Sequence, residues 1–272
     1  MFSQRTITVG LIQMDCVLMD REQNLRRALQ FLSELVGKAE LVCLPELFTT
    51  GYNLDVMGTA LYELAETIPG PTTEELCQKG RNYGMAIFAN LVEKDQKVEG
   101  VLYDTSFLID SRGELLGKYR KTHLYPKEHQ FFRAGDRLSV FELDGIVVGS
   151  AICYEHAFPH IFSMLALQGA RIVYIPSAVP VDYEYLLNLR TRARAQDNQM
   201  FTLAVNRVGR DGETTYCGLS KIVNPRGEVI AEASSTEEEL LIAEIDLSLI
   251  LKERQQEPIF RSMRPELYHF TS

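Results

Sequence analysis

Three side chains in the 272-residue sequence have the chemistry of a nucleophile, a base and a cation. Cys153 follows the apolar run 145–152 and precedes a helix-like segment, so helix N–H groups and their dipole would favour its thiolate. The N–H of Tyr154 would stabilise an oxyanion formed after thiolate attack. Glu46 and Lys121 each follow an apolar, strand-like run, and they would supply a general base and an ammonium group. Together these residues predict acyl-transfer chemistry.

Each of these residues also has a structural interpretation. A cysteine at a strand end can fill the core as a small apolar side chain, Glu46 can cap a helix, and Lys121 can be a surface charge. A rival site is a zinc centre, because Cys153, His156 and His160 have the spacing C-x2-H-x3-H. No fourth ligand is obvious in the sequence. We therefore expect no metal.

The elements that must position these residues alternate between strand and helix. Apolar periodicity predicts an α/β fold, in which the site residues gather at one edge of a sheet. The turns within 109–115 and 223–229 are similar, which indicates either two similar halves or two ordinary hairpins. The predicted strands are 6–13, 40–44, 85–92, 101–109, 114–119, 145–152, 171–175, 201–208, 216–223, 229–233 and 240–245, and the predicted helices are 21–38, 72–83, 159–168 and 185–199.

Composition excludes several classes of protein. The formal net charge is −9, which argues against a nucleic-acid partner. No apolar run has the length of a membrane span, and the first residues lack the apolar region of a signal peptide. Five scattered cysteines without a CxxC pair suggest reduced thiols, and hence a cytoplasmic location. Phosphate-binding glycine loops are absent from the sequence.

The local sequences around the three candidate residues resemble the motifs of the nitrilase superfamily of carbon-nitrogen hydrolases. Leu44–Phe48 with Gly51 and Tyr52 is similar to the first motif, in which Glu46 takes the place of the general base. Tyr119–Leu124 is similar to the second and places Lys121 as the catalytic lysine. The third is similar to Ile152–Glu155 with Phe158 and Pro159, which places Cys153 as the nucleophile. The resemblance extends over nearly the whole chain.

The resemblance implies a four-layer α-β-β-α sandwich, formed here by a single domain over residues 1–272. It also implies that Glu128, seven residues after Lys121, is a second glutamate that orients the lysine and substrate. Family tails similar to residues 258–272 reach across to a partner subunit, so we expect an extended tail and a homodimer or larger homo-oligomer. The implied reaction cleaves a small amide with water through a thioester on Cys153, and it needs no cofactor. The sequence alone leaves open a nitrilase, an N-carbamoyl amidohydrolase with the same three residues, or a non-catalytic binding module.

The pocket departs from the family pattern in places. Members that act on ω-amides of dicarboxylic acids often have an arginine where this chain has Ala157, so a substrate carboxylate is not expected at that position. An acidic residue is usual where His160 stands. Asp182 and Glu184 lie in a loop where family members contact substrate, which makes them candidates for attracting an amine-bearing amide; the alternative is that both are solvated acids. Further candidates for the substrate pocket are Tyr52, Glu155, His156 and Ala178, whereas Arg190, Arg192, Arg194, Asn198 and Asn206 are expected to have buried scaffold roles.

Overall fold

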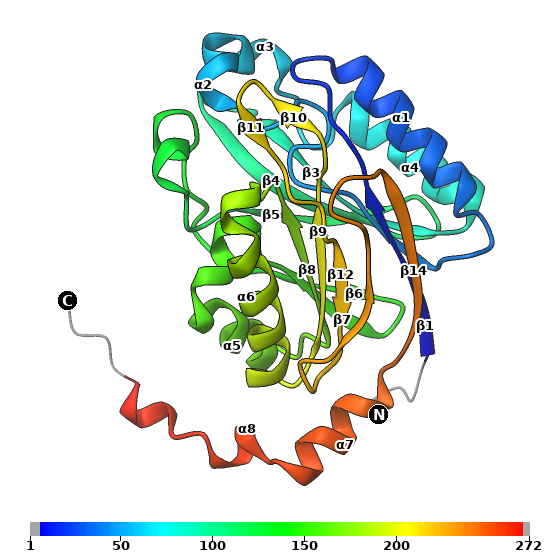
Figure 1. The fold of residues 1–272 in the computed structure, drawn as a ribbon, viewed down its shortest axis with the longest axis vertical. Coiled ribbons are helices and arrows are strands. Elements are labelled where there is room, and N and C mark those ends of the chain that lie inside the picture. The colour runs from blue at the N-terminus through cyan, green and yellow to red at the C-terminus, as the bar shows by residue number, and fades with distance from the viewer. Residues whose placement is uncertain (1–5, 269–272) are drawn as a thin grey trace.

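The computed structural model describes residues 6–268, which form two six-stranded sheets packed face to face (Figure 1). The first sheet has the order β14-β1-β2-β3-β4-β5, with bounds Glu239–Asp246, Thr6–Gln13, Leu41–Cys43, Ala86–Lys94, Leu102–Ile109 and Leu115–Arg120. The second has the order β13-β12-β9-β8-β7-β6, with bounds Val229–Glu232, Lys221–Val223, Phe201–Asn206, Ile172–Ser177, Ile146–Ser150 and Val140–Leu143.

Both sheets have the same pattern of strand directions. In each sheet three adjacent strands are parallel (β1-β2-β3 and β7-β8-β9), and antiparallel strands flank them. The two similar turns in the sequence occupy equivalent places, between β4 and β5 and between β12 and β13. In each turn one side chain, Asp110 or Asn224, accepts hydrogen bonds from the N–H groups two and four residues later. The two halves are therefore similar in topology as well as in turn chemistry.

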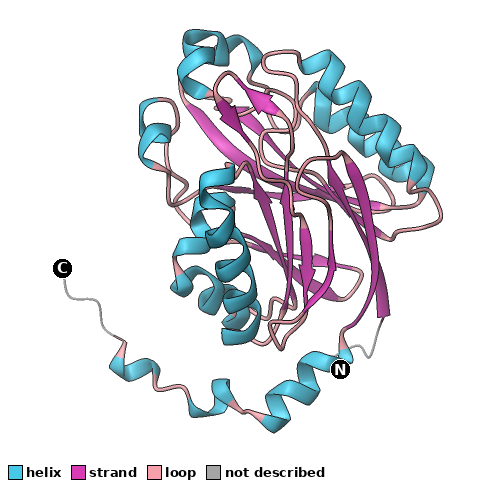
Figure 2. Cartoon of the chain, in the orientation of Figure 1, coloured by secondary structure: helices cyan, strands magenta, loops and turns pink. Residues whose placement is uncertain are grey.

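The molecule has four layers, helices, sheet, sheet and helices, and apolar side chains fill the three spaces between them. Alternating strand residues face opposite sides: in β8, Ile172 and Tyr174 pack between the sheets, whereas Val173 and Ile175 pack against the outer helices. Helices α1 (Arg21–Glu34) and α4 (Pro71–Tyr83) cover the first sheet, and α5 (Pro159–Leu167) with α6 (Glu184–Asp197) cover the second (Figure 2). The predicted α-β-β-α sandwich is therefore the observed fold.

Several elements depart from the predicted ranges. Residues 216–220 precede β12 as irregular backbone, because Gly218 and Leu219 adopt positive φ angles of 57° there. Short elements without a long apolar period were not predicted. These are β6, the hairpin β10 (Arg210–Asp211) and β11 (Thr214–Thr215), and the helices α2 (Leu54–Met57), α3 (Leu61–Leu64) and α7 (Ser248–Gln256).

The C-terminal segment leads away from the sandwich after α7 (Figure 1). It contains two short helical stretches, α8 (Ile259–Ser262) and a 3-10 turn over Pro265–Leu267, and residues 269–272 of the predicted tail lie outside the described part. Within residues 6–268, no helix is both long and apolar enough to cross a membrane.

Candidate active site

Glu46 lies in the tight loop that follows β2, at the carboxyl end of the parallel strands. The Asn90 side chain of β3 accepts a hydrogen bond from the N–H of Leu47 at 2.7 Å, and Leu47 adopts a positive φ of 46°. This bond fixes the loop where the strand ends, so that the Glu46 side chain turns into the interior and is fully buried. The loop predicted after this strand therefore has a defined, side-chain-stabilised conformation.

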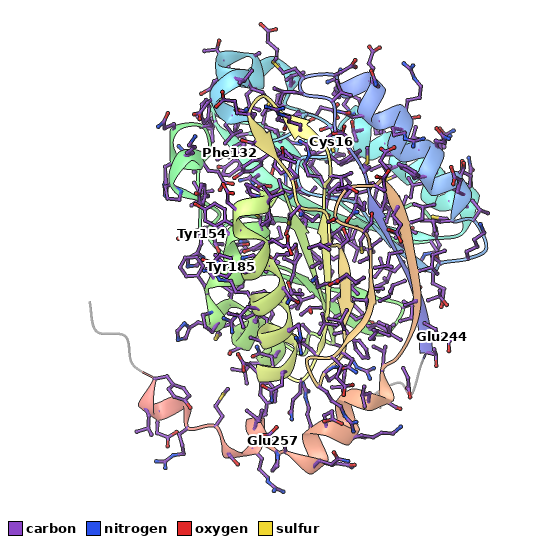
Figure 3. All side chains as sticks on the ribbon, in the orientation of Figure 1. Cys16, Phe132, Tyr154, Tyr185, Glu244 and Glu257 are labelled. Atoms are coloured by element: carbon purple, nitrogen blue, oxygen red, sulfur yellow. The ribbon has the colours of Figure 1, made fainter. Side chains whose placement is uncertain are left out.

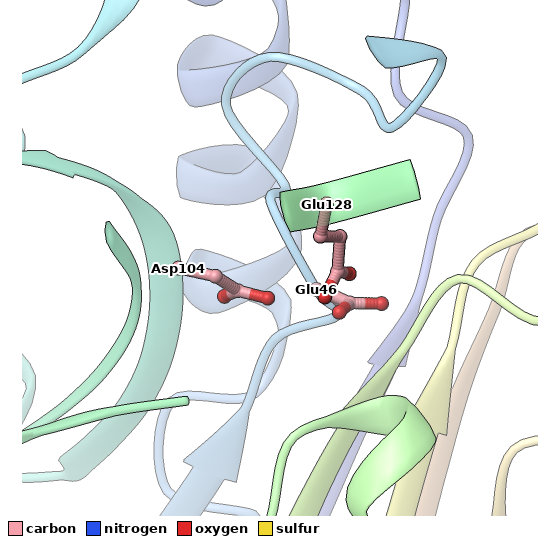
Figure 4. Close-up of side chains that lie close together, drawn as sticks. All are labelled: Glu46, Asp104 and Glu128. Carbon is pink, nitrogen blue, oxygen red and sulfur yellow. The ribbon is translucent and has the colours of Figure 1, made fainter. Parts of the chain in front are cut away.

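The Lys121 ammonium group is surrounded by three buried carboxylates. Its Nζ lies 2.7 Å from Glu46 Oε1, 2.7 Å from Glu128 Oε1 and 3.2 Å from Asp104 Oδ2. Figure 4 shows the three carboxyl groups converging from β4, from the loop after β2 and from the 3-10 helix η2 (Pro126–Gln130). All four side chains are fully buried. The lysine is thus held in place by charge from three separate elements.

Burial and charge act in opposite directions in this cluster. Burial alone would lower the pKa of Lys121, but the negative charges of Glu128, Glu46 and Asp104 outweigh it and hold the pKa well above its usual value. Burial raises the pKa of Glu46 well above that of an ordinary glutamate, and the charge of Lys121 only partly opposes this shift. Lys121 is therefore charged at neutral pH, and Glu46 is a stronger base than an exposed carboxylate.

Glu128 is positioned by two tyrosines. The Tyr52 hydroxyl donates to its Oε1 at 2.5 Å, and the Tyr125 backbone N–H donates to its Oε2 at 2.7 Å. With the Lys121 ammonium as a third donor, both carboxylate oxygens are satisfied. Tyr52, placed by the sequence in the pocket, thus also holds the lysine network in position.

Cys153 begins a 3-10 helix, η3 (Cys153–Ala157), and adopts a strained φ of 43°. The predicted helix 159–168 corresponds to α5, which starts at Pro159. Because the 3-10 helix η3 lies between Cys153 and α5, the expected effect of an α-helix dipole on the thiolate is not present. Burial and the charge of Glu46 raise the pKa of the Cys153 thiol well above its usual value. The resting sulfur is therefore a thiol that needs a base.

Glu155 connects the Cys153 and Lys121 segments. Its Oε1 accepts from the Tyr119 hydroxyl at 2.6 Å and from the Thr122 N–H at 2.8 Å, and its Oε2 accepts from the Ile152 N–H at 2.7 Å. The side chain is fully buried. It lies away from the pocket lining in which the sequence had placed it. Its contacts make it the residue that holds the two loops at a fixed separation.

A pocket of about 340 Å³ opens onto Cys153. Tyr52, His156 and Ala178, all predicted for the pocket, line it together with Tyr154. The predicted Asp182 is not among the lining residues, and its side chain is exposed. The walls are largely aromatic and aliphatic. The pocket therefore suits a small substrate that is held mainly by apolar contact.

Two nitrogen-containing side chains of the pocket wall, His156 and Arg190, have groups without a partner among the described residues. His156 is 3% exposed, and its Nδ1 has no hydrogen-bond partner among the described residues. Burial and the charges of Arg190 and Arg194 lower the pKa of His156 to about 3, so this imidazole is neutral. Arg194 has the expected scaffold role and donates to the His156 carbonyl oxygen at 3.1 Å. Arg190 is half-buried and forms no ion pair or hydrogen bond within residues 6–268, contrary to the predicted scaffold role.

The residues of the alternative zinc site do not converge. Within residues 6–268, only Glu46, Asp104 and Glu128 bring three candidate ligand atoms within 4.8 Å of one another. The Lys121 ammonium group already lies among these carboxylates. His160 is exposed on the first turn of α5. The C-x2-H-x3-H spacing therefore does not correspond to a metal site in this fold.

Comparison with known proteins identifies the family. Residues 8–255 match the carbon-nitrogen hydrolase family. The chain belongs to this family. It is 36% identical over 276 residues to a nitrilase of Pyrococcus abyssi, which covers 96% of this chain and 99% of that protein. It is 31% identical over 263 residues to the 2-oxoglutaramate amidase of Bacillus subtilis, covering 96% and 99%. The crystal structure of Saccharomyces cerevisiae Nit3, a nitrilase-superfamily member, superimposes with a TM-score of 0.86 at 28% identity, over 94% of this chain and 95% of that one.

Two residues of this carbon-nitrogen hydrolase were not recognised as site residues from the sequence. Asp104 lies within the strand β4, where a single acidic residue gives no indication of its partners. The signal available for it was burial: an aspartate in a strand whose eight residues are all buried requires a charged or hydrogen-bonding partner. Arg190 had been assigned to the scaffold with the neighbouring arginines, although its position four residues before Arg194 places both on one face of α6.

Proposed function

We propose that this carbon-nitrogen hydrolase cleaves the amide bond of a small substrate through a thioester on Cys153. Glu46 accepts the Cys153 proton, and the resulting thiolate attacks the carbonyl carbon. Lys121 and the Tyr154 N–H stabilise the oxyanion. The C–N bond then breaks as protonated Glu46 gives its proton to the leaving nitrogen, and ammonia or an amine departs.

Water completes the reaction in the reverse order of proton transfer. Glu46, again ionised, accepts a proton from water as the oxygen attacks the thioester carbon. The C–S bond breaks, the thiol recovers a proton from Glu46, and the carboxylic acid product leaves. Glu128 keeps Lys121 oriented toward the oxyanion throughout.

The observation that carries this proposal is the placement of Lys121 at 2.7 Å from both Glu46 and Glu128, beside a pocket that exposes Cys153. Three buried groups joined by charge at the base of a cavity are typical of catalytic rather than structural clusters. The raised pKa of the thiol also requires a neighbouring base, and Glu46 is the carboxylate whose charge acts on it most strongly.

The test measures ammonia release from simple amides, N-carbamoyl compounds and nitriles by the wild type, Cys153→Ala and Cys77→Ala. Cys77 is a half-buried thiol on α4, outside the pocket, so its variant is the matched control. We expect Cys153→Ala to abolish release and Cys77→Ala to retain it. Equal activity of Cys153→Ala and the wild type would refute the proposal. The panel also distinguishes amide, ureido and nitrile hydrolysis, which begin with the same thiolate attack.

We further propose that the preferred amide carries an anionic group. Ala157 removes the cation that an arginine would supply there, but Arg190 presents a guanidinium to the same pocket from α6. The other cationic residue of the pocket lining, Lys127, is paired with Asp55 at 2.5 Å, which leaves Arg190 as the unpaired charge among the described lining residues. The similarity to a 2-oxoglutaramate amidase agrees with such a substrate. Asp182 does not favour an amine-bearing amide, since it lies outside the pocket lining.

The substrate charge is tested by comparing kcat/KM for an amide with a terminal carboxylate and for its neutral methyl analogue. Arg190→Met should reduce kcat/KM for the anionic amide about 10- to 100-fold, the range expected for one charged hydrogen bond, with a much smaller change for the neutral one. Lys127→Met is the matched control. An equal loss on both amides would assign Arg190 a structural role and refute the anionic substrate.

We propose a homo-oligomer that assembles through the outer helices α5 and α6. Leu167, Tyr185 and Leu189 on these helices are 52%, 64% and 63% exposed, and Figure 3 shows Tyr185 at the outer side of α6. Large exposed apolar side chains on one surface indicate a protein contact. Leu189→Glu should shift the mass measured by light scattering to that of a monomer.

The five free cysteines also support a reducing compartment such as the cytoplasm.

A further inference from the structure

The charges of the Lys121 cluster do not balance. Three carboxylates, Glu46, Asp104 and Glu128, surround one ammonium group, and all four side chains are fully buried. If all were ionised, a dry interior would hold a net charge of two negative units. Such a cluster reaches a lower free energy by retaining a proton on one carboxyl group.

The hydrogen bonds indicate which carboxyl groups share this proton. Glu128 accepts three donors, from Tyr52, Lys121 and Tyr125, and is fully satisfied as a carboxylate. In contrast, Glu46 Oε2 and Asp104 Oδ2 are buried and have no hydrogen-bond partner among the described residues. The carboxyl groups of Glu46 and Asp104 belong to the cluster whose oxygen atoms lie within 4.8 Å of one another, so a proton on one of them would supply the missing donor to the other.

Asp104 is the weaker partner of Lys121. Its Oδ2 is 3.2 Å from Nζ but is not hydrogen-bonded to it, whereas Glu46 Oε1 accepts from Nζ at 2.7 Å. The Asp104 Oδ1 accepts from Asn90 Nδ2 at 2.8 Å, a neutral donor that a protonated carboxyl group retains through its carbonyl oxygen. Protonation of Asp104 therefore sacrifices fewer hydrogen bonds than protonation of Glu46 or Glu128. Figure 4 shows its carboxyl group directed toward Glu46.

We propose that Asp104 is protonated in the resting enzyme and donates a hydrogen bond to Glu46, so that Glu46 stays ionised and oriented as the general base. This role rests on the proposed function of Glu46. When Cys153 gives its proton to Glu46, Asp104 keeps its own, and the cluster contains one proton more until the leaving group takes it. Asp104 is thus a positioning residue that acts through Glu46.

The surroundings of Asp104 are consistent with this assignment. The groups that act on it are Lys121 after β5, Glu128 of η2, Asn90 of β3 and Glu46 after β2. From β8 on the facing sheet, the neutral Tyr174 hydroxyl lies near enough to be affected by its charge, and it donates to the Leu44 carbonyl oxygen. Burial is the largest influence and raises the pKa of Asp104 above its usual value, and the charge of Glu128 adds to this, whereas Lys121 and side-chain hydrogen bonds with Asn90 and Glu46 lower it.

The direct test is the infrared carbonyl band of a protonated carboxylic acid, measured near neutral pH on the wild type, Asp104→Asn and Glu46→Gln. We expect the band in the wild type and in Glu46→Gln, and its loss in Asp104→Asn. Absence of the band in the wild type would overturn the proposal without any variant. A band that survives in Asp104→Asn but is lost in Glu46→Gln would place the proton on Glu46, which also overturns it.

The matched control is Asp110→Asn, at the end of the same strand. Asp110 accepts backbone hydrogen bonds in its turn, and Asn224 does the same in the equivalent turn, so this variant is expected to fold. Burial alone would raise the pKa of Asp110, but hydrogen bonds from Glu114 and Arg112 outweigh it and lower that pKa. The Asp110 carboxyl group is therefore ionised, and its replacement should leave the acid band in place.

The pH dependence of kcat/KM should shift in opposite directions in Asp104→Asn, depending on whether Asp104 is protonated or ionised in the wild type. If Asp104 is protonated, Asp104→Asn replaces a strong O–H donor with a weaker N–H donor, and the acid limb of kcat/KM should move about half a unit to one unit toward higher pH. If Asp104 is ionised, the substitution removes a negative charge, and the limb should move toward lower pH. The second result would overturn the proposal. The infrared band requires no turnover, so it is independent of whether the proposed reaction occurs.

Discussion

Replacement of Lys121 by methionine should destabilise this protein strongly. The substitution preserves side-chain volume but leaves the buried carboxyl groups of Glu46, Asp104 and Glu128 without the cation that they surround. Breaking a buried ion pair by removing one partner costs about 3–5 kcal/mol. For a chain of this length the entropy of unfolding is about 0.6 kcal/mol/K, so we expect the melting temperature to fall by about 5–9 °C.

The loss of stability in Lys121→Met should depend on pH with a definite sign. Without the ammonium group, the folded-state pKa values of Glu46 and Asp104 rise further above their unfolded values, because burial is then opposed by fewer charges. Groups with a raised folded-state pKa contribute stability below the unfolded pKa, and this contribution is lost as pH rises through the folded pKa. The variant should therefore be destabilised more at about pH 8 than at about pH 5.

The assay is urea unfolding of the wild type, Lys121→Met and the control Lys118→Met at both pH values. Lys118 lies on β5, the strand that precedes Lys121, and pairs with the buried Glu93 at 2.5 Å, but its side chain is 31% exposed and Arg120 also binds Glu93 at 2.6 Å. Its replacement should cost about 1 kcal/mol or less. Equal losses in both variants, or a loss in Lys121→Met that does not change with pH, would refute this account of the cluster.

Three further measurements test the site and the fold. Tyr52→Phe removes the hydroxyl that donates to Glu128 and should lower kcat/KM about tenfold, with unchanged circular dichroism; no change in kcat/KM would show that this bond does not orient the cluster. Because its pKa is raised, Cys153 should react with iodoacetamide faster as pH increases from about 6 to 9, and a rate independent of pH would indicate a thiolate already at pH 6. Gly113→Ala should destabilise more than Gly227→Ala, as judged by melting temperature. Both glycines have positive φ in equivalent turns, but an added Cβ would meet a carbonyl oxygen of α4 at 2.2 Å in the first turn and no atom closer than 3.1 Å in the second; equal shifts would contradict this.

The sequence predicted elements with a long apolar period and missed those without one. Helix α1 buries Ala28, Phe31 and Leu32, which follow the helical period, and Asp20 caps it through the Gln23 N–H. The strands β1 and β8 alternate between two apolar clusters. In contrast, the hairpin of β10 and β11 has two residues per strand, and its conformation depends on the buried Arg207–Asp211 pair. Elements of that length contain too few residues for a period to be visible.

Within the candidate site, the sequence by itself determined which reactive groups are available and at which strand ends they lie. Glu46, Lys121 and Cys153 follow strands β2, β5 and β7, and chain order with strand direction brings such loops to one region. Local motifs also indicated Glu128. These features depend on residues that are close together in the chain, and they can therefore be recognised from the sequence.

Only the tertiary structure decided how these groups are ionised and oriented. Asp104 reaches Lys121 from inside a strand, Glu155 connects two loops more than thirty residues apart, and Arg190 enters the pocket from α6. The raised pKa values of the thiol and of Glu46 follow from burial and from charges that separate elements bring together. Electrostatic energy depends on distances through space and on exclusion of water, and spacing along the chain specifies neither.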